Sequence, residues 1–388
     1  IIDAPGHRDF IKNMITGASQ ADVALLLVPA DGNFTTAITK GDHKAGEIQG
    51  QTRQHARLLN LLGVKQLIVG VNKMDCDVAK YSKERYDEIA AEMKGMLQRV
   101  GWKKDFVEKN VPVLPLSGWK GDNLLKKSEN MAWWTGADVL RQDGEKVHVD
   151  TLLQALDQLV CLPKREVDKP MRMPVSGLYQ IKGVGDVVTG RIEQGVVKPK
   201  DEVVFLPTHT GSNSCGGKVF SIEMHHTSIP QANPGDNVGL NMKGLVKTNM
   251  PRTGDVMVFQ KDSSLQTAGS FTAQVQILDI PGELKAGYCP TIYVRTGHSA
   301  CRLKKINWKM GKETGGKKAE DVVSLKSNEM AELVFEPIQP LVVDTFQNCE
   351  GLSRLAVMEG NGVVMLGKCV GTTPREDKAA AAKGKGKK

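Results

Sequence analysis

The hydrophobic pattern of this chain changes near residue 163. Before that point, short apolar runs alternate with segments in which apolar side chains recur every three or four residues. This alternation predicts strands and helices in turn, and therefore a mostly parallel sheet covered by helices. After that point, short strand-like segments are separated by frequent glycines, which is typical of all-β barrels. The pattern predicts an α/β domain followed by all-β structure.

One helix of the first part has a clear periodicity. Apolar side chains between residues 86 and 100 share one helical face, with Ser82 as a candidate N-cap and Gly101 as a stop signal. This stripe predicts core packing. For Trp133-Trp134 we also expect packing at the edge of the core, with a partner-binding surface as the alternative. Further helices are predicted over 10–18 and 150–160, and strands over 1–2, 23–28, 67–71 and 113–116.

Prolines and charged residues separate the predicted domains. Residues 163–170 form a charged linker bounded by prolines. The predicted domains are a partial nucleotide-binding α/β domain over 1–162, a β-barrel over 171–262 and a second β-barrel over 268–373. A basic, low-complexity tail over 374–388 is expected to be disordered.

The composition is that of an ordinary globular protein, with 40% hydrophobic and 25% charged residues. A net charge of +8 suits an RNA partner, although many proteins without one are equally basic. The seven cysteines show no C-x-x-C spacing, which favours free thiols in a reducing compartment. The longest apolar run is far shorter than the roughly 20 residues of a membrane span. We expect a cytoplasmic protein with no membrane role.

Two motifs follow predicted strands directly. Asp3-x-x-Gly6 follows the first strand, and Asn72-Lys73-x-Asp75 follows the strand over 67–71. In open α/β sheets, ligands bind in the crevice along the carboxyl ends of the strands. A carboxylate at Asp75 can accept hydrogen bonds from N1–H and N2–H₂ of guanine, and adenine offers no such pair of donors. Asn72 would brace the loop and contact the base, while the stem of Lys73 would lie over the ring.

The remaining groups of a GTPase site are present near these motifs. Ser117-Gly118 follows the last strand and offers a backbone donor to guanine O6. Asp3 would hold Mg²⁺ through water, and the Gly6 N–H would reach the γ-phosphate. His7 follows directly, where it can orient the attacking water. The motifs predict a GTPase with GTP or GDP and Mg²⁺ as its ligands.

The phosphate-binding loop is missing from the sequence. No run of the form G-x-x-x-x-G-K-[ST] occurs in the 388 residues, and the chain begins with Ile1 inside a motif. We therefore expect an N-terminally truncated part of a longer GTPase, lacking its first strand, P-loop and first switch. This 388-residue chain is expected to bind GTP poorly and to be inactive by itself.

Longer stretches around the motifs resemble the translation elongation factor 1-alpha family. They are 3–17, 63–75, 117–119, 234–239 and 286–290, and the resemblance covers essentially residues 1–370. It implies a P-loop-type GTPase domain, here partial, followed by two β-barrels. It also implies delivery of aminoacyl-tRNA to the ribosomal A site in a GTP-dependent manner, with a guanine-nucleotide exchange factor as a further partner.

The resemblance also implies roles for individual residues. It implies a catalytic role for His7, and Mg²⁺ binding through water for Asp3. It implies tRNA binding at Glu223 and Asn237, two positions that line the pocket for the tRNA 3′ end and its amino acid. The residues implied in nucleotide binding are Asp3, Gly6, Asn72, Lys73, Met74, Asp75, Ser117, Gly118 and Trp119.

Two segments depart from the ordinary family pattern. Residues 41–49 look like an insertion, and residues 211–217 also differ. Both features are similar to the elongation factor-like proteins that replace elongation factor 1-alpha in some microbial eukaryotes. They bear on partner surfaces, such as exchange-factor docking, more than on GTP hydrolysis.

Two other functions remain open at this point. A related GTPase of translation termination or ribosome rescue would bind a release-factor-like protein in place of tRNA. A non-catalytic scaffold that binds RNA or the cytoskeleton would need no nucleotide, and its function would survive loss of His7.

Overall fold

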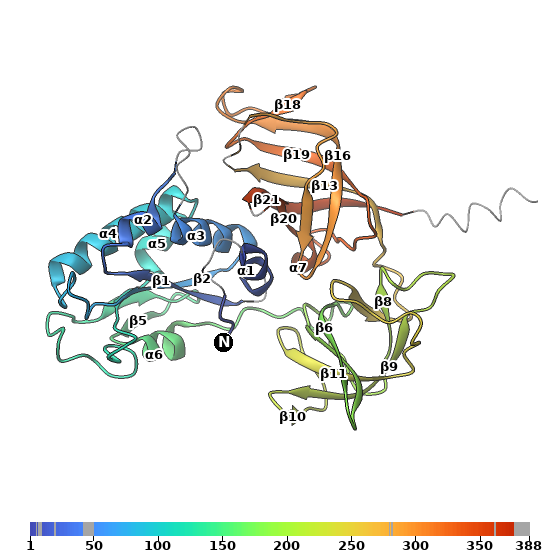
Figure 1. Cartoon of the computed structure of the whole chain (residues 1–388), viewed down its shortest axis with the longest axis horizontal. Helices are drawn as coiled ribbons and strands as arrows, with labels where there is room; N and C mark the ends of the chain where they lie inside the picture. The colour runs from blue at the N-terminus through green and yellow to red at the C-terminus, as the bar shows by residue number, and fades with distance from the viewer. Residues whose placement is uncertain are drawn as a thin grey trace, which may run out of the picture. The chain divides into compact units, whose positions relative to one another are not determined.

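The computed structural model describes residues 1–4, 6, 10–18, 21–41, 50–278, 280, 282–360 and 362–375. Contacts divide the chain into two compact units, Ile1–Pro163 and Lys164–Lys388 (Figure 1). The division falls where the hydrophobic pattern changes.

The first unit is built on a three-stranded parallel sheet with the order β1-β2-β3. Its strands are β1 (Val23–Pro29), β2 (Gln66–Asn72) and β3 (Val113–Pro115), which confirms three of the predicted strands. The central strand β2 is buried up to its last residue, Asn72. Pro29 pairs with Asn72, and Val71 pairs with Pro115, so the three carboxyl ends lie at one edge.

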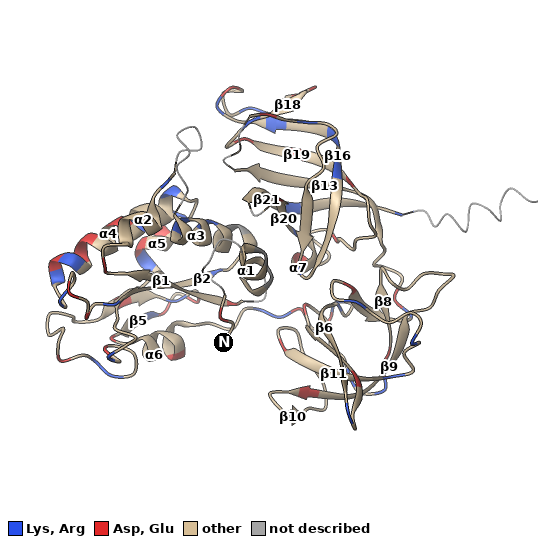
Figure 2. Ribbon diagram, viewed as in Figure 1, with Lys and Arg blue, Asp and Glu red and all other residues tan. Residues whose placement is uncertain are grey.

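Helices cover this sheet, with α2, α3 and α4 along one side of β1 and β2 in Figure 1. The predicted long helix is confirmed as α4, and the Ser82 hydroxyl accepts a hydrogen bond from the Arg85 N–H at 3.2 Å. In Figure 2, stretches of the α4 ribbon coloured for acidic and for basic residues follow one another, as expected for a helix with a solvated face. The helices are α1 (Ile11–Ala18), α2 (Phe34–Ile38), α3 (Gln51–Leu62), α4 (Lys83–Arg99), α5 (Lys104–Lys109) and α6 (Leu152–Gln154).

Some predicted elements differ from the structure. Ile1-Ile2 forms no strand, and Ile1 is fully exposed. No strand of the described residues pairs with Ile1-Ile2, so its backbone gains no ladder hydrogen bonds to offset the entropy lost on ordering. The predicted last helix becomes a π-helix over Ala155–Leu159 after α6. An antiparallel hairpin of β4 (Ala137–Leu140) and β5 (Lys146–Val149) was not predicted.

The tryptophan pair packs inside the first unit, as expected. Trp134 is 6% exposed and donates its indole N–H to the Asp150 carbonyl at 2.9 Å. Trp133 donates to the Tyr81 carbonyl at 2.7 Å, and both rings contact Tyr86.

The second unit contains two barrels of mainly antiparallel strands. The first barrel follows the order β10-β9-β11-β7-β6-β12-β8 and closes through the β8–β9 pairing. Its core gathers apolar side chains from every part of the ring, including Val188, Phe205 and Leu240. Its strands are β6 (Met173–Ile181), β7 (Gly185–Arg191), β8 (Glu202–Leu206), β9 (Gly216–Met224), β10 (Thr227–Ser228), β11 (Asn237–Lys243) and β12 (Val256–Phe259).

The second barrel follows the order β15-β20-β21-β13-β19-β16-β17 and closes through the β15–β16 pairing. Its main strands are β13 (Ala268–Ile277), β15 (Thr291–Val294), β16 (Gly297–Met310), β19 (Met330–Pro337), β20 (Arg354–Glu359) and β21 (Gly362–Pro374). Shorter elements are β14 (Leu284–Lys285), β17 (Ala319–Glu320), β18 (Ser324–Leu325) and α7 (Glu350–Ser353).

An apolar cluster joins the two barrels. Val204, Val256 and Val258 of the first barrel pack in one buried cluster with Leu265, Val342, Cys349 and Leu352. The seven cysteines of the chain are all free thiols.

In the part of the chain that the structure describes, no helix combines the length and the apolar character that crossing a membrane requires.

Candidate functional site

Side chains that follow β2 and β3 meet at the carboxyl edge of the sheet. Asn72 Oδ1 accepts hydrogen bonds from the Gly118 and Lys73 N–H groups, both at 2.8 Å. The Ser117 hydroxyl donates to Asp75 Oδ1 at 2.6 Å. The structure therefore brings together two motifs that lie about forty residues apart in the sequence.

The backbone around Asp75 is held from both sides. Met74 is fully buried and donates its N–H to the Leu116 carbonyl at 3.1 Å. Ser117 is also fully buried, and its hydroxyl accepts the Lys120 N–H at 3.0 Å. Because Ser117 occupies one carboxylate oxygen of Asp75, the other lone pairs remain for a ligand.

The backbone donor expected at Ser117-Gly118 is already used. Ser117 N–H donates to the Asp122 carbonyl at 3.2 Å, and Gly118 N–H donates to Asn72. The next residue, Trp119, is 86% exposed, and its N–H has no acceptor among the described residues. The sequence did not show that the Ser117 and Gly118 N–H groups are used within the protein, because those hydrogen bonds depend on how the loop closes.

A polar network fixes the loop that carries Ser117. Asp122 accepts hydrogen bonds from the Tyr81 hydroxyl at 3.0 Å and from the Ser128 hydroxyl at 2.6 Å. Burial, together with the Asp122 carboxylate, raises the pKa of Tyr81 to about 12, so the phenol remains a donor at neutral pH. The buried Asn123 amide donates to the Pro115 carbonyl at 2.9 Å. These residues tie the loop to the end of β3.

Lys73 has an ionic partner that the sequence analysis missed. Lys73 Nζ lies 2.9 Å from Asp31 Oδ2, and Lys73 has a positive φ of 65°. The hydrogen bond from Lys73 lowers the pKa of Asp31, and the same contact raises the pKa of Lys73. Arg85 of α4 donates to the Ala30 and Asp31 carbonyls, both at 3.2 Å. Asp31 lies just after β1, so the strand-end rule that found Asn72 could also have found it.

The groups predicted to face the phosphates are not joined to the base site by contacts among the described residues. Asp3 and Gly6 are exposed in irregular backbone near the start of the chain, and the predicted catalytic His7 lies outside the described residues. Among the described residues, none has an atom within 4 Å of the place that a Cβ at Gly6 would take. The described residues contain no cluster of three or more His, Cys, Asp or Glu suited to a metal ion.

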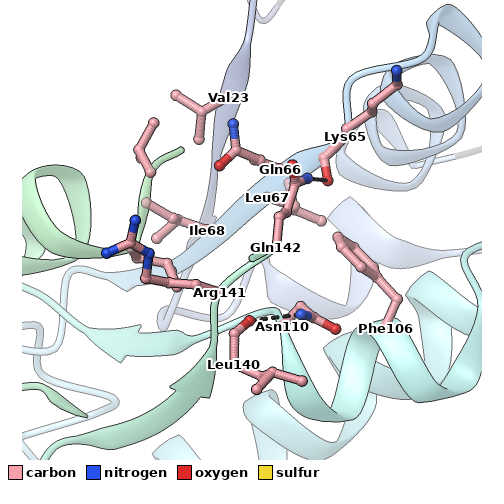
Figure 3. Close-up of a pocket in the computed structure, with 12 residues that line it drawn as sticks. Val23, Lys65, Gln66, Leu67, Ile68, Phe106, Asn110, Leu140, Arg141 and Gln142 are labelled. Carbon is pink, nitrogen blue, oxygen red and sulfur yellow. Dashed lines mark hydrogen bonds between the residues drawn. The ribbon is translucent and has the colours of Figure 1, made fainter. Parts of the chain in front are cut away.

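A small cavity lies at the opposite end of the sheet, near the starts of β1 and β2 (Figure 3). Its volume of about 20 Å³ has room for a single water molecule. Gln142 donates to the Lys65 carbonyl at 2.8 Å beside it. Its size and position exclude it as the nucleotide site.

The two predicted tRNA residues lie on the outer face of the first barrel. Glu223 of β9 is opposite Gly239 of β11, and Gly239 is opposite Thr189 of β7. Asn237 is two residues from Gly239, so by strand alternation its side chain shares this face with Glu223. Both Glu223 and Asn237 are exposed. Because Gly239 has no side chain, the backbone between them is open to a ligand.

Comparisons with known proteins agree with this architecture. Residues 1–161 match the elongation factor Tu GTP binding domain, residues 185–258 match elongation factor Tu domain 2, and residues 270–370 match the GTP-eEF1A C-terminal domain-like family. The oocyte form of elongation factor 1-alpha from Xenopus laevis is 42% identical over 386 residues, covering 99% of this chain and 78% of the relative.

Two solved structures of sup35 also match, one complexed with GDP and one with GMPPNP. Both have a TM-score of 0.49 and cover 92% of this chain and 80% of the other, with 26% and 25% sequence identity.

A GTP-binding domain followed by two β-barrels defines the class of translational GTPases. Within this class, the chain belongs to the elongation factor 1-alpha family, whose members bind and hydrolyse GTP. The expected fold class and family are confirmed.

Proposed function

We propose that this protein carries aminoacyl-tRNA to the ribosomal A site as a GTP complex and releases it after hydrolysis. The observation that supports this most directly is the convergence of Asn72, Asp75 and Ser117 at one edge of the sheet. An exposed barrel face with Glu223 and Asn237 supports the tRNA part of the proposal. The ribosome and an exchange factor are the further partners, and the cytoplasm is the compartment.

In this proposal, Asp75 selects guanine. Its free lone pairs accept N1–H and N2–H₂, while the Ser117 hydroxyl holds the carboxylate in place. Trp119 N–H, rather than Gly118 N–H, donates to O6. Lys73, held by Asp31, places its aliphatic stem over the ring. A base without the matching donors leaves a desolvated carboxylate unpaired, which is costly.

The phosphate end of the site uses Asp3, Gly6 and His7. The exposed carboxylate of Asp3 fits Mg²⁺, a hard cation that prefers oxygen ligands and keeps several of its waters. When bound, the ion would neutralise charge on the phosphates. Gly6 N–H would contact the γ-phosphate, and His7 would orient the attacking water.

Protection of the aminoacyl ester tests the tRNA proposal. The protein, expressed from its complete open reading frame, should slow deacylation of aminoacyl-tRNA with GTP and much less with GDP. Glu223→Ala should weaken this protection roughly tenfold or more, because the polar contact proposed between Glu223 and the 3′ end is lost. Glu202→Ala, which removes an exposed glutamate of β8 in the same barrel, is the control. Recovery of a release-factor-like protein, without any GTP-dependent tRNA protection, would favour the termination alternative.

Ribosome-triggered hydrolysis tests His7. His7→Ala should lower the hydrolysis rate about 10²-fold or more, because a group that positions the attacking water is lost. Affinity for GTP should stay nearly unchanged. Single-turnover phosphate release with ribosomes, and nucleotide binding without them, measure the two quantities. An unchanged hydrolysis rate would remove His7 from the mechanism.

A further inference from the structure

A cavity within the second unit has no role in nucleotide or tRNA binding as described above. Its volume is about 600 Å³, which lies in the range of small-molecule sites, roughly 300–1,000 Å³. It is lined by the segment after β8, by the connection between the barrels, and by Pro340 and Arg375. One wall includes Gly211, which belongs to the segment that departs from the family pattern.

The departing segment is well ordered by hydrogen bonds. The Asn249 amide, 9% exposed, donates to the Asn213 and Ser214 carbonyls at 3.4 and 3.1 Å. Thr210 N–H donates to the Asn213 carbonyl at 3.0 Å. His209 Nδ1 accepts the Cys215 N–H at 3.0 Å, which leaves Nε2 of the ring to carry a hydrogen and act as a donor. These hydrogen bonds within the protein hold this wall of the cavity in place without a ligand.

Among the described lining residues, Arg375 carries a positive charge, and the other polar side chains can donate hydrogen bonds. No Asp or Glu is among these described residues; Glu376 and Asp377 follow Arg375 in the sequence and lie outside the described part of the chain. Arg375 forms no ion pair within the described part of the chain, and its backbone N–H donates to the Thr267 carbonyl at 2.9 Å. Hydroxyls of Thr210, Ser263 and Thr267 and the amide of Gln266 add further donors.

The other part of the lining is apolar. It consists of Leu206, Pro207, Leu265 and Pro340. Leu265 belongs to the buried cluster that joins the barrels, and Leu206 packs against that cluster. Packing therefore holds the two leucines of this wall in place.

We propose that this cavity binds a small phosphate monoester with an apolar organic group. The phosphate pairs with the Arg375 guanidinium and the surrounding donors, because charge-assisted hydrogen bonds of arginine to phosphate are among the strongest in proteins. The organic group lies against Leu206, Pro207 and Leu265. The site is independent of the guanine site, whose residues belong to the other unit.

Phenyl phosphate is the probe, with inorganic phosphate and phenol as its two halves. Titration calorimetry and ³¹P line broadening on the complete chain should show one site for phenyl phosphate, bound more tightly than either half. Arg375→Gln should weaken binding roughly tenfold or more, because it removes the charge that the phosphate pairs with. Gln266→Trp, which fills an exposed part of the cavity, should also weaken it.

Arg302→Gln is the matched control. Arg302 is an exposed arginine of β16 with no ion pair among the described residues, so the charge change is the same and the position is different. The affinity of the Arg302→Gln variant for phenyl phosphate should stay within about twofold of the parent value, as expected for a screened surface charge. Equal weakening in both arginine variants, or no binding of phenyl phosphate at millimolar concentration, would overturn the proposal. Displacement by a short RNA at far lower concentration would reassign the cavity to nucleic acid.

Discussion

At the scale of single residues, the surroundings of Asp75 decide what it can recognise. Its carboxylate is an acceptor only, and Ser117 satisfies one oxygen at 2.6 Å. The remaining lone pairs of the carboxylate can accept hydrogen bonds from two neighbouring donors of one base, such as N1–H and N2–H₂ of guanine. Replacing one carboxylate oxygen by an amide group reverses half of that pattern, since an amide presents both an acceptor and donors.

Asp75→Asn should therefore change the base preference from guanine to xanthine. Xanthine offers a carbonyl oxygen where guanine has its exocyclic amine, so the new amide N–H gains a partner there. We expect guanine affinity to fall by about 10²-fold or more, with xanthine affinity rising. Competition between GDP and XDP on the complete protein measures this ratio. Retained preference for GDP would show that Asp75 does not read the base.

At the scale of elements, α4 shows how local signals fix a helix. Its buried positions, Ile89, Met93, Met96 and Leu97, form one stripe against the core. Ser82 caps the first turn, and Gly101 follows the helix with a φ of +108°. Capping and burial agree at both ends and outweigh the poor helix propensity of Gly95 in the interior, which is why the ends were predicted to within a residue.

Ser82→Ala should destabilise the first unit by about 1 kcal/mol, because the Arg85 N–H loses its side-chain acceptor. Ser82→Thr should retain most of the stability, since its hydroxyl can still accept the Arg85 N–H and donate to Glu84. Urea unfolding, followed by far-ultraviolet circular dichroism, compares the variants. An alanine variant as stable as the parent would mean that water replaces the cap without cost.

At the scale of the whole molecule, a buried ion pair joins the two barrels of the second unit. Arg295 lies 2.7 Å from Glu193, and the two side chains are only 12% and 8% exposed. Arg295 Nε and Glu193 Oε1 are buried without hydrogen-bond partners. Each of these buried charges has lost its hydration. The attraction between the two charges compensates for that cost only while both are present.

Arg295→Met should destabilise the second unit by about 3–5 kcal/mol, because it leaves the Glu193 carboxylate buried and unpaired. The double variant with Glu193→Leu should recover a large part of that loss. Lys304→Met, which breaks the exposed pair with Glu336, should cost less than about 1 kcal/mol. Scanning calorimetry measures the stability of the two single variants and of the double variant. Additive losses in the double variant would show that the two charges do not depend on each other.

The sequence by itself determined the change from an α/β to an all-β pattern, the three parallel strands, the helices α1 and α4, and the place of the Asn72 to Asp75 motif after β2; it did not reveal the β4–β5 hairpin. The hydrophobic period and the ends of a strand depend on residues that are neighbours in the sequence. The strand over 67–71 and the motif Asn72 to Asp75 could therefore be placed without a structure. Only the tertiary structure decided which groups meet: Asp31 with Lys73, Asp122 with Tyr81, and Arg295 with Glu193. The reason is physical. Pairs of polar groups far apart in sequence are chosen by packing and by the need to satisfy buried donors and acceptors, and one strand or helix carries no record of that choice.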